Sequence, residues 1–180
     1  MTSHAGTPPR GTLWALAAVV LAAISSACQS PDPKAELTVS DVETYWVLDA
    51  PVGSTQYMAP AVRFRVTNEA KKAWGSIQAT ATFRRKGEEG QSWGSAWQPV
   101  TATDKSLAPG EGVLVVMRSD GRYYSSGTPE SMFHHDLFRD AKVEIYLRIG
   151  ASPWTKFWDG DVERRVGTKD LAAEATATKP

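Results

Sequence analysis

This chain of 180 residues has one cysteine and three histidines, and its 20 basic side chains are balanced by 20 acidic ones. A single cysteine forms neither an internal disulfide nor a cysteine-rich zinc site. Three histidines are few for a metal centre. A net charge of zero, with the basic residues scattered along the chain, lacks the positive patch that binds polyanions and argues against a nucleic-acid partner. We expect no metal and no cofactor.

The sequence also lacks an apolar run long enough to cross a bilayer. The run at 12–24 falls short of the roughly 18 residues that a spanning helix needs. It follows a polar segment with one positive charge, Arg10, and ends in the short residues at 25–27. This layout is typical of a signal peptide, and we predict that residues 1–27 are removed by a cut before Cys28.

Residues 24–28 (Ile-Ser-Ser-Ala-Cys) close the apolar run. They resemble the lipobox of bacterial lipoproteins, in which the cysteine receives a diacylglycerol and becomes the first residue of the mature chain. The resemblance implies a membrane partner through lipid at Cys28, and Gln29 after it implies sorting to the outer membrane, with the domain facing the periplasm. The alternative is a soluble secreted or periplasmic protein cut at the same bond, which leaves a free thiol.

The mature chain divides into three parts. Residues 28–36 carry two prolines and no large apolar side chain, which indicates a tether after the lipidated cysteine. Residues 37–167 have the size of one domain, and residues 168–180 are predicted to be a disordered tail.

Apolar and polar residues alternate with a period of two through much of the domain, the pattern of a strand with one buried face. The pattern is clearest at 62–66, 77–83 and 143–149, and a continuous apolar run at 113–117 is typical of a central strand. Further strands are expected at 37–48, 97–103 and 157–166. One short helix is expected at 128–139, because Thr128 can cap it, Pro129 suits its first turn, and Phe133 and Leu137 share a face.

About seven strands with polar turns and no repeated βαβ alternation predict an all-β fold, an antiparallel β-sandwich. Two short motifs, Val66-Thr67-Asn68 at a strand end and residues 107–111 (Leu-Ala-Pro-Gly-Glu) before the next strand, resemble the Ig-like modules of bacterial envelope proteins, of the FxLYD and CARDB type. The resemblance implies an Ig-like sandwich and says little about activity.

Three patterns suggest chemistry. Residues 90–94 fit the G-x-S-x-G motif of serine hydrolases around Ser92, but a nucleophile elbow needs a helix next, where this chain has Pro99. The pair His134 and His135 points in two directions on any regular element, so polar surface positions are the favoured interpretation over a metal site. The carboxylates at 159, 161 and 163 fit a charged strand face better than a calcium loop.

Aromatic residues are the most unusual feature of the domain, which keeps six tryptophans after cleavage. Trp46 is expected in the core, together with Trp154 or Trp158. A candidate binding surface consists of four loop or hairpin aromatics: Trp93, Trp97, Tyr123 and Tyr124. Two alternatives are open for them, exposure as a binding surface or packing back onto the edge of the domain.

The leading functional hypothesis is a membrane-anchored, non-catalytic Ig-like module that binds an envelope protein or other envelope component. The first alternative is a carbohydrate- or peptidoglycan-binding module that uses Trp93, Trp97 and Trp154. The second alternative is a serine esterase centred on Ser92.

Overall fold

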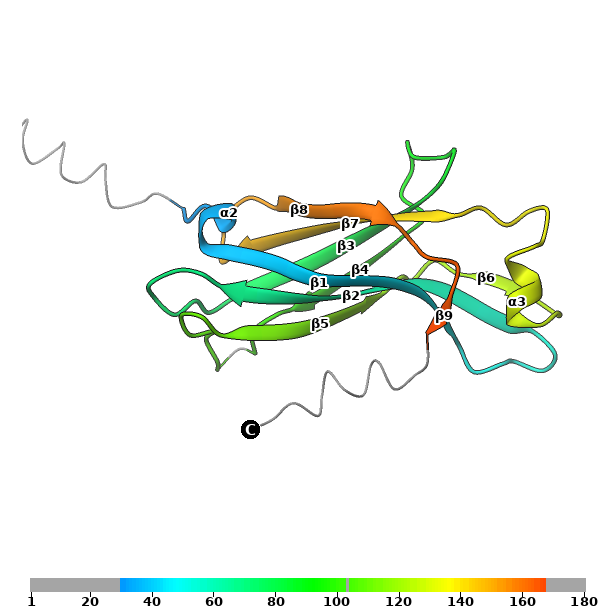
Figure 1. Ribbon diagram of the computed structural model, residues 1–180, viewed down its shortest axis with the longest axis horizontal. Helices are drawn as coiled ribbons and strands as arrows, with labels where there is room; N and C mark the ends of the chain where they lie inside the picture. The colour runs from blue at the N-terminus through cyan, green and yellow to red at the C-terminus, as the bar shows by residue number, and fades with distance from the viewer. Residues whose placement is uncertain (1–29, 103, 168–180) are drawn as a thin grey trace, which may run out of the picture. The chain divides into compact units, whose positions relative to one another are not determined.

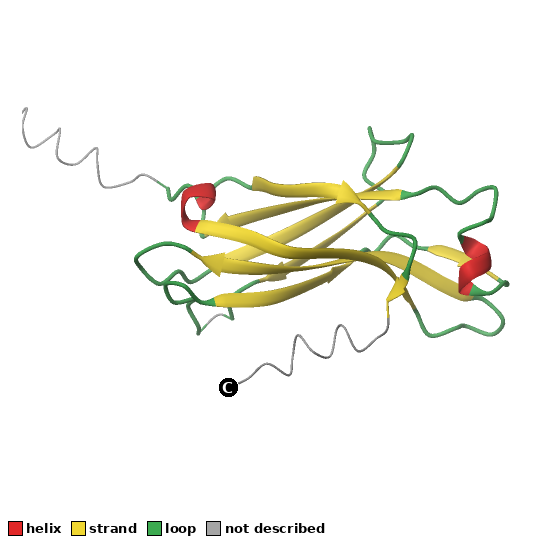
Figure 2. Ribbon diagram, in the orientation of Figure 1, coloured by secondary structure: helices red, strands yellow, loops and turns green. Residues whose placement is uncertain are grey.

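The computed structural model describes residues 30–102 and 104–167. The predicted signal peptide, Cys28 and the tail at 168–180 lie outside the described residues. Two β-sheets pack face to face, which confirms the predicted all-β sandwich (Figures 1 and 2). One sheet has the order β5-β2-β1-β9, with β6 paired to β2, and the other has the order β4-β3-β7-β8.

The strands of the first sheet are β1 (Leu37–Leu48), β2 (Gln56–Asn68), β5 (Gly112–Arg118), β6 (Tyr123–Ser125) and β9 (Val166–Gly167). Those of the second are β3 (Ile77–Arg85), β4 (Gly94–Pro99), β7 (Ala141–Ile149) and β8 (Thr155–Asp161). All neighbouring strands are antiparallel except β1 and β9. In an Ig domain, strands A, B and E share one sheet, and strands C, F and G share the other. Here β1, β2 and β5 correspond to A, B and E, and β3, β7 and β8 correspond to C, F and G.

The period-two alternation decides which side chains form the core. Val62, Phe64 and Val66 of β2 face the interior with no exposed surface, and every second residue of β3 and β7 does the same. Burying one such side chain contributes about 1.5–3 kcal/mol relative to leaving it in water. All seven predicted strands exist, although several of their boundaries differ. The run at 113–117 was expected to be a central strand, and this is wrong: β5 lies at the edge of its sheet, pairs only with β2 among the described residues, and buries only Val115 and Met117.

The expected strand at 97–103 begins and ends earlier, as β4 (Gly94–Pro99). Its start is fixed by Gly94, where a Cβ atom would lie 2.1 Å from Oγ of Ser119 and 2.6 Å from the amide nitrogen of Gly121. The carboxylate of Asp120 accepts a hydrogen bond from the amide of Ser95 at 2.6 Å. Only glycine allows this close approach of the loop after β5, so β4 starts there.

The predicted helix at 128–139 is wrong in length, since the helix α3 spans only Pro129–Met132. Thr128 caps it as expected, by accepting from the amide of Ser131. Beyond it, Nδ1 of His135 accepts a hydrogen bond from the amide of Leu137 at 3.1 Å, a local side-chain bond that competes with helical hydrogen bonding. Leu137 consequently points outward with 73% exposure, and Phe138 is buried in its place.

The predicted strand at 157–166 is divided. β8 ends at Asp161, and the chain then crosses to the other sheet, where β9 pairs with β1. The hydroxyl of Thr44 directs this crossing, because it donates to the carbonyl of Asp161 and accepts from the amide of Glu163, both at 3.0 Å. Neither β9 nor β6 was expected from the sequence.

The expected tether is shorter than residues 28–36. The helix α2 (Pro33–Glu36) is capped by Asp32, whose carboxylate accepts from the amide of Lys34 at 3.0 Å. The Glu36 carboxylate accepts a hydrogen bond from Nε1 of Trp74 at 3.1 Å. This segment therefore belongs to the domain. Among the described residues, no helix is long and apolar enough to span a membrane.

Candidate binding site

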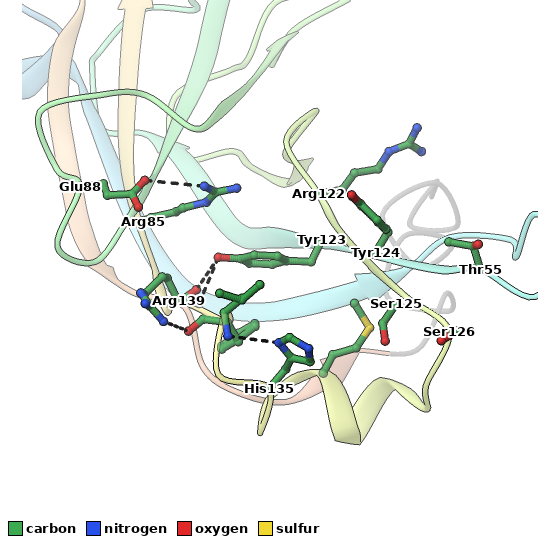
Figure 3. A pocket seen from close by; sticks show the side chains of 13 residues that line it. Thr55, Arg85, Glu88, Arg122, Tyr123, Tyr124, Ser125, Ser126, His135 and Arg139 are labelled. Carbon is green, nitrogen blue, oxygen red and sulfur yellow. Dashed lines mark hydrogen bonds and ion pairs between the residues drawn. The ribbon is translucent and has the colours of Figure 1, made fainter.

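An open cleft of about 810 Å³ lies at the end of the sandwich that carries β6 and α3. Figure 1 shows this end of the fold, and Figure 3 shows the side chains that line the cleft. The edge strand β6 and the chain beyond α3 supply most of its lining. Thr55 of the loop between β1 and β2, and Arg85 and Glu88 at the turn after β3, complete it. Three stretches that are far apart in the sequence, at 55, 85–88 and 122–139, therefore meet at this end.

The side chain of Tyr123 lies in the cleft between Arg85 and Arg139 (Figure 3). Its ring packs on Trp93, with ring centroids 4.8 Å apart, and on Phe138 at 5.1 Å. Its hydroxyl accepts from the amide of Arg139 at 3.1 Å and donates to the carbonyl of the same residue at 3.2 Å. These contacts hold β6 against the segment after α3 and make the cleft a preformed feature.

Arg85 is one of three arginines that give the cleft its charge. Its guanidinium lies 4.9 Å from the ring centroid of Trp93 and 5.3 Å from that of Tyr123, close enough for cation–π attraction. Nη1 is 3.6 Å from the carboxylate of Glu88, and the buried Nε has no hydrogen-bond partner in the described part of the chain. The group is thus held in place while part of its hydrogen-bonding capacity is unused.

Arg139 and Arg122 complete the set. Nη1 of Arg139 donates to the carbonyls of Asp136 and Phe138, and no carboxylate of residues 30–102 or 104–167 pairs with it. Arg122 stacks on Tyr57 at 4.5 Å and lies 3.5 Å from Asp49. Against these three cations the cleft lining has one carboxylate, Glu88. The cleft therefore favours an anionic ligand.

A pair of charged residues fastens the segment that follows α3. The carboxylate of Asp140 accepts from Nε and Nη2 of Arg164 at 2.7 and 3.0 Å, and Nη1 of Arg164 donates to the carbonyl of Phe133. The hydrogen bond from Arg164 lowers the pKa of the Asp140 carboxyl below its ordinary value, against the raising effect of partial burial. The carboxylate stays ionised at neutral pH and keeps this wall of the cleft joined to the connection between β8 and β9.

The four aromatic residues proposed as a binding surface are separated by the structure. Tyr124 is 74% exposed and lines the cleft, and Trp97 is 59% exposed but lies on β4, outside the cleft. Trp93 and Tyr123 are half-buried and pack against the core. Of the two alternatives, exposure is therefore confirmed for Trp97 and Tyr124, and packing back onto the domain is confirmed for Trp93 and Tyr123.

Sequence reasoning missed the three arginines of the cleft. Arg85 lies in the basic run at 84–86, far along the chain from Arg122 and Arg139, and nothing in their spacing indicates that the loops bring them together. The only available signal was local, since Arg122 immediately precedes the two tyrosines that had been singled out.

The outer face of the four-stranded sheet carries a second group of aromatics. Trp97 of β4 stands in register with Thr80 of β3 and Tyr146 of β7. Nearby, Trp154 is 37% exposed, and the guanidinium of Arg148 lies 4.5 Å from its ring. This face presents aromatic rings beside polar groups, and none of these residues lines the cleft.

The other candidate residues are placed as follows. The hydroxyl of Ser92 donates to the carbonyl of Gly94 at 3.3 Å, and strand β4 follows it where a nucleophile elbow requires a helix.

His134 and His135 are both exposed. The carboxylates of Asp159, Asp161 and Glu163 pair with three different cations, Lys156, Lys86 and Arg165. Among the described residues, no three metal-ligating side chains cluster.

No protein-family model and no curated protein sequence matches this chain. The ApaA protein from Bordetella pertussis aligns with 72% of this chain and 94% of its own, at 14% identity and a TM-score of 0.40. A β-glucuronidase from Bacteroides uniformis aligns with 70% of this chain, at 16% identity and a TM-score of 0.39, and this likeness covers only 12% of the glucuronidase. Likenesses this distant assign no function to the chain.

Proposed function

We propose that the protein is a lipoprotein of the outer membrane, anchored through Cys28, whose Ig-like domain faces the periplasm and binds an envelope partner without catalysis. The signal peptide layout and the lipobox resemblance at residues 24–28 support the anchor. The cleft at the β6 end carries the binding part of the proposal, because it is open, preformed by Tyr123 and charged by three arginines.

The anchor predicts a specific covalent state of Cys28. In cells that produce the full-length protein, we expect the membrane fraction to contain a chain that begins at Cys28, with its mass raised by acyl chains. Each buried methylene adds about 0.8 kcal/mol of membrane affinity, so the Cys28→Ser variant should move to the soluble fraction. Intact-mass analysis of both fractions measures this. An unmodified Cys28 in the soluble fraction contradicts the anchor.

The cleft predicts where the partner binds. With photoreactive benzoylphenylalanine in place of Tyr124, irradiation of intact cells should give a discrete protein adduct, resolved by electrophoresis and identified by mass spectrometry. The matched control places the same group at Trp97, which is similarly exposed on the outer face of the other sheet. If position 124 gives no adduct, the cleft is not the binding site.

Glycan binding is the second candidate function, and the exposure of Trp97 and Trp154 on one face of the four-stranded sheet favours it. Exposed aromatic rings beside polar groups suit the stacking of sugar rings. In the crosslinking experiment, an adduct with peptidoglycan at position 97, and none at position 124, would select this candidate over the first.

A further inference from the structure

In the described part of the chain the strand β6 is paired along one edge only, and its residues line the cleft. Its pairing joins Gln56, Tyr57 and Met58 of β2 to residues 125, 124 and 123, and the described residues supply no partner on its other side. Residues 123–126 all line the cleft, although successive side chains of a strand point to opposite faces. Three consecutive residues of a strand can line one cleft only where the cleft reaches an edge of that strand, and the edge toward β2 is already paired.

An unpaired strand edge presents backbone N–H and C=O groups that an incoming extended peptide can pair with. The three residues of β6 span about 10 Å, enough for two or three backbone hydrogen bonds. Tyr124, exposed beside this edge, offers a ring against which a side chain of the peptide can pack. Backbone pairing alone gives little sequence preference, so the side chains around the edge determine the ligand.

Those side chains are cationic. Arg139 has no carboxylate partner among the described residues, and its guanidinium is oriented by two backbone carbonyls. Arg85 has a buried Nε without an acceptor and only a long contact, 3.6 Å, to Glu88. Carboxylates on a ligand can bind the exposed nitrogens of these two guanidinium groups, because charge-assisted bonds from arginine to a carboxylate are the strongest that these groups form.

We propose that the cleft binds an extended acidic peptide segment of a partner protein, which adds to the free edge of β6 as a further strand while its carboxylates bind Arg139 and Arg85. This inference rests on the proposed function and names the chemistry of the partner. The peptide's backbone gives the register, and its Asp or Glu side chains give the preference.

The test selects a phage-displayed library of random twelve-residue peptides against the full-length protein, purified from membranes in detergent. We expect the enriched peptides to carry two or more Asp or Glu residues each. For a synthetic enriched peptide, replacing its carboxylates by amides should weaken the affinity at least tenfold, as should the Arg139→Ala variant. The matched control is Arg65→Ala, at the opposite end of β2, whose only ion-pair partner among the described residues is Asp41.

Amide hydrogen exchange distinguishes strand addition from binding by charge attraction alone, because charge attraction would not protect the backbone amides of β6. Bound peptide should slow amide exchange in the segment 122–127, which contains β6, and leave β4 unchanged. Enriched peptides without excess acidity, equal affinity for the Arg139→Ala protein, or unchanged exchange at 122–127 would each overturn the inference. If no peptide is enriched while position 124 still gives a protein adduct, the strand-addition inference fails and the proposed function stands. If no peptide is enriched and position 124 gives no adduct, both the inference and the proposed binding function fail.

Discussion

Replacing Asn68 by Asp should lower the free energy of unfolding by about 3–5 kcal/mol at neutral pH, a large part of the about 5–15 kcal/mol that a domain of this kind has. Asn68, the only asparagine in the chain, is fully buried at the end of β2. Its Nδ2 donates to the carbonyls of Lys72 and Leu107, both at 2.8 Å, and its Oδ1 accepts from the amide of Ala70 at 3.0 Å. An aspartate would direct a buried negative charge at two carbonyl oxygens.

The matched control is Gln78→Glu, the same amide-to-acid change on the outer face of β3. There the amide oxygen of Gln78 accepts from Nε and Nη2 of Arg148 at 2.9 and 2.6 Å. A carboxylate oxygen can accept the same two hydrogen bonds, so the free energy of unfolding should change by less than about 1 kcal/mol. Urea unfolding followed by circular dichroism measures both variants. A loss below about 1 kcal/mol for Asn68→Asp would contradict the hydrogen bonding described here.

The effect of Asn68→Asp should also depend on pH. Burial and the two facing carbonyls would raise the pKa of an aspartic acid at this position above its unfolded value of about 3.9. A raised folded-state pKa means that the protonated form is better tolerated, and the variant loses stability as pH rises through that pKa. The difference from the parent protein should therefore be smaller at about pH 4.5 than at neutral pH.

Asn68 also shows what sequence patterns could and could not supply. The motifs at 66–68 and 107–111 resemble those of Ig-like modules, but their sequences do not indicate that the two motifs are in contact. The structure joins them: Asn68 binds the carbonyl of Leu107 through its side chain, and its backbone exchanges hydrogen bonds with Gly110 and Glu111. The strands on either side were predictable because period-two alternation is a local property of the chain.

The cleft was not predictable for the opposite reason. Its lining comes from loops, and the positions of loops depend on tertiary contacts such as the bond from Tyr123 to Arg139. The predicted helix at 128–139 is wrong in the same region, where α3 ends at Met132 and the amide of Leu137 donates to the side chain of His135, a local bond that the helical pattern does not reveal. β6 is too short to carry a periodic signal, and only its pairing with β2 defines it.

Replacing Trp46 by Ala should cost about 3–5 kcal/mol and loosen the cleft at the same time. Trp46 was predicted in the core and is fully buried there. Its ring contacts an aromatic group whose centroids lie 5.2–6.2 Å away: Trp93, Tyr123, Phe133 and Phe138. Tyr123 lines the cleft directly, so a cavity at position 46 removes the support beneath the arginines.

Trp97→Ala is the matched control, because it removes the same side chain from a position that is 59% exposed, and its cost should stay within about 0.5 kcal/mol. The loss in free energy of unfolding for Trp46→Phe should lie between those of Trp46→Ala and Trp97→Ala. It keeps most of the packing and removes the Nε1–H, which is buried without an acceptor among the described residues. Chemical unfolding followed by far-ultraviolet circular dichroism ranks the three variants without relying on tryptophan emission. If Trp46→Ala and Trp97→Ala lower the free energy of unfolding equally, the aromatic cluster around Trp46 does not stabilise the domain as its packing indicates.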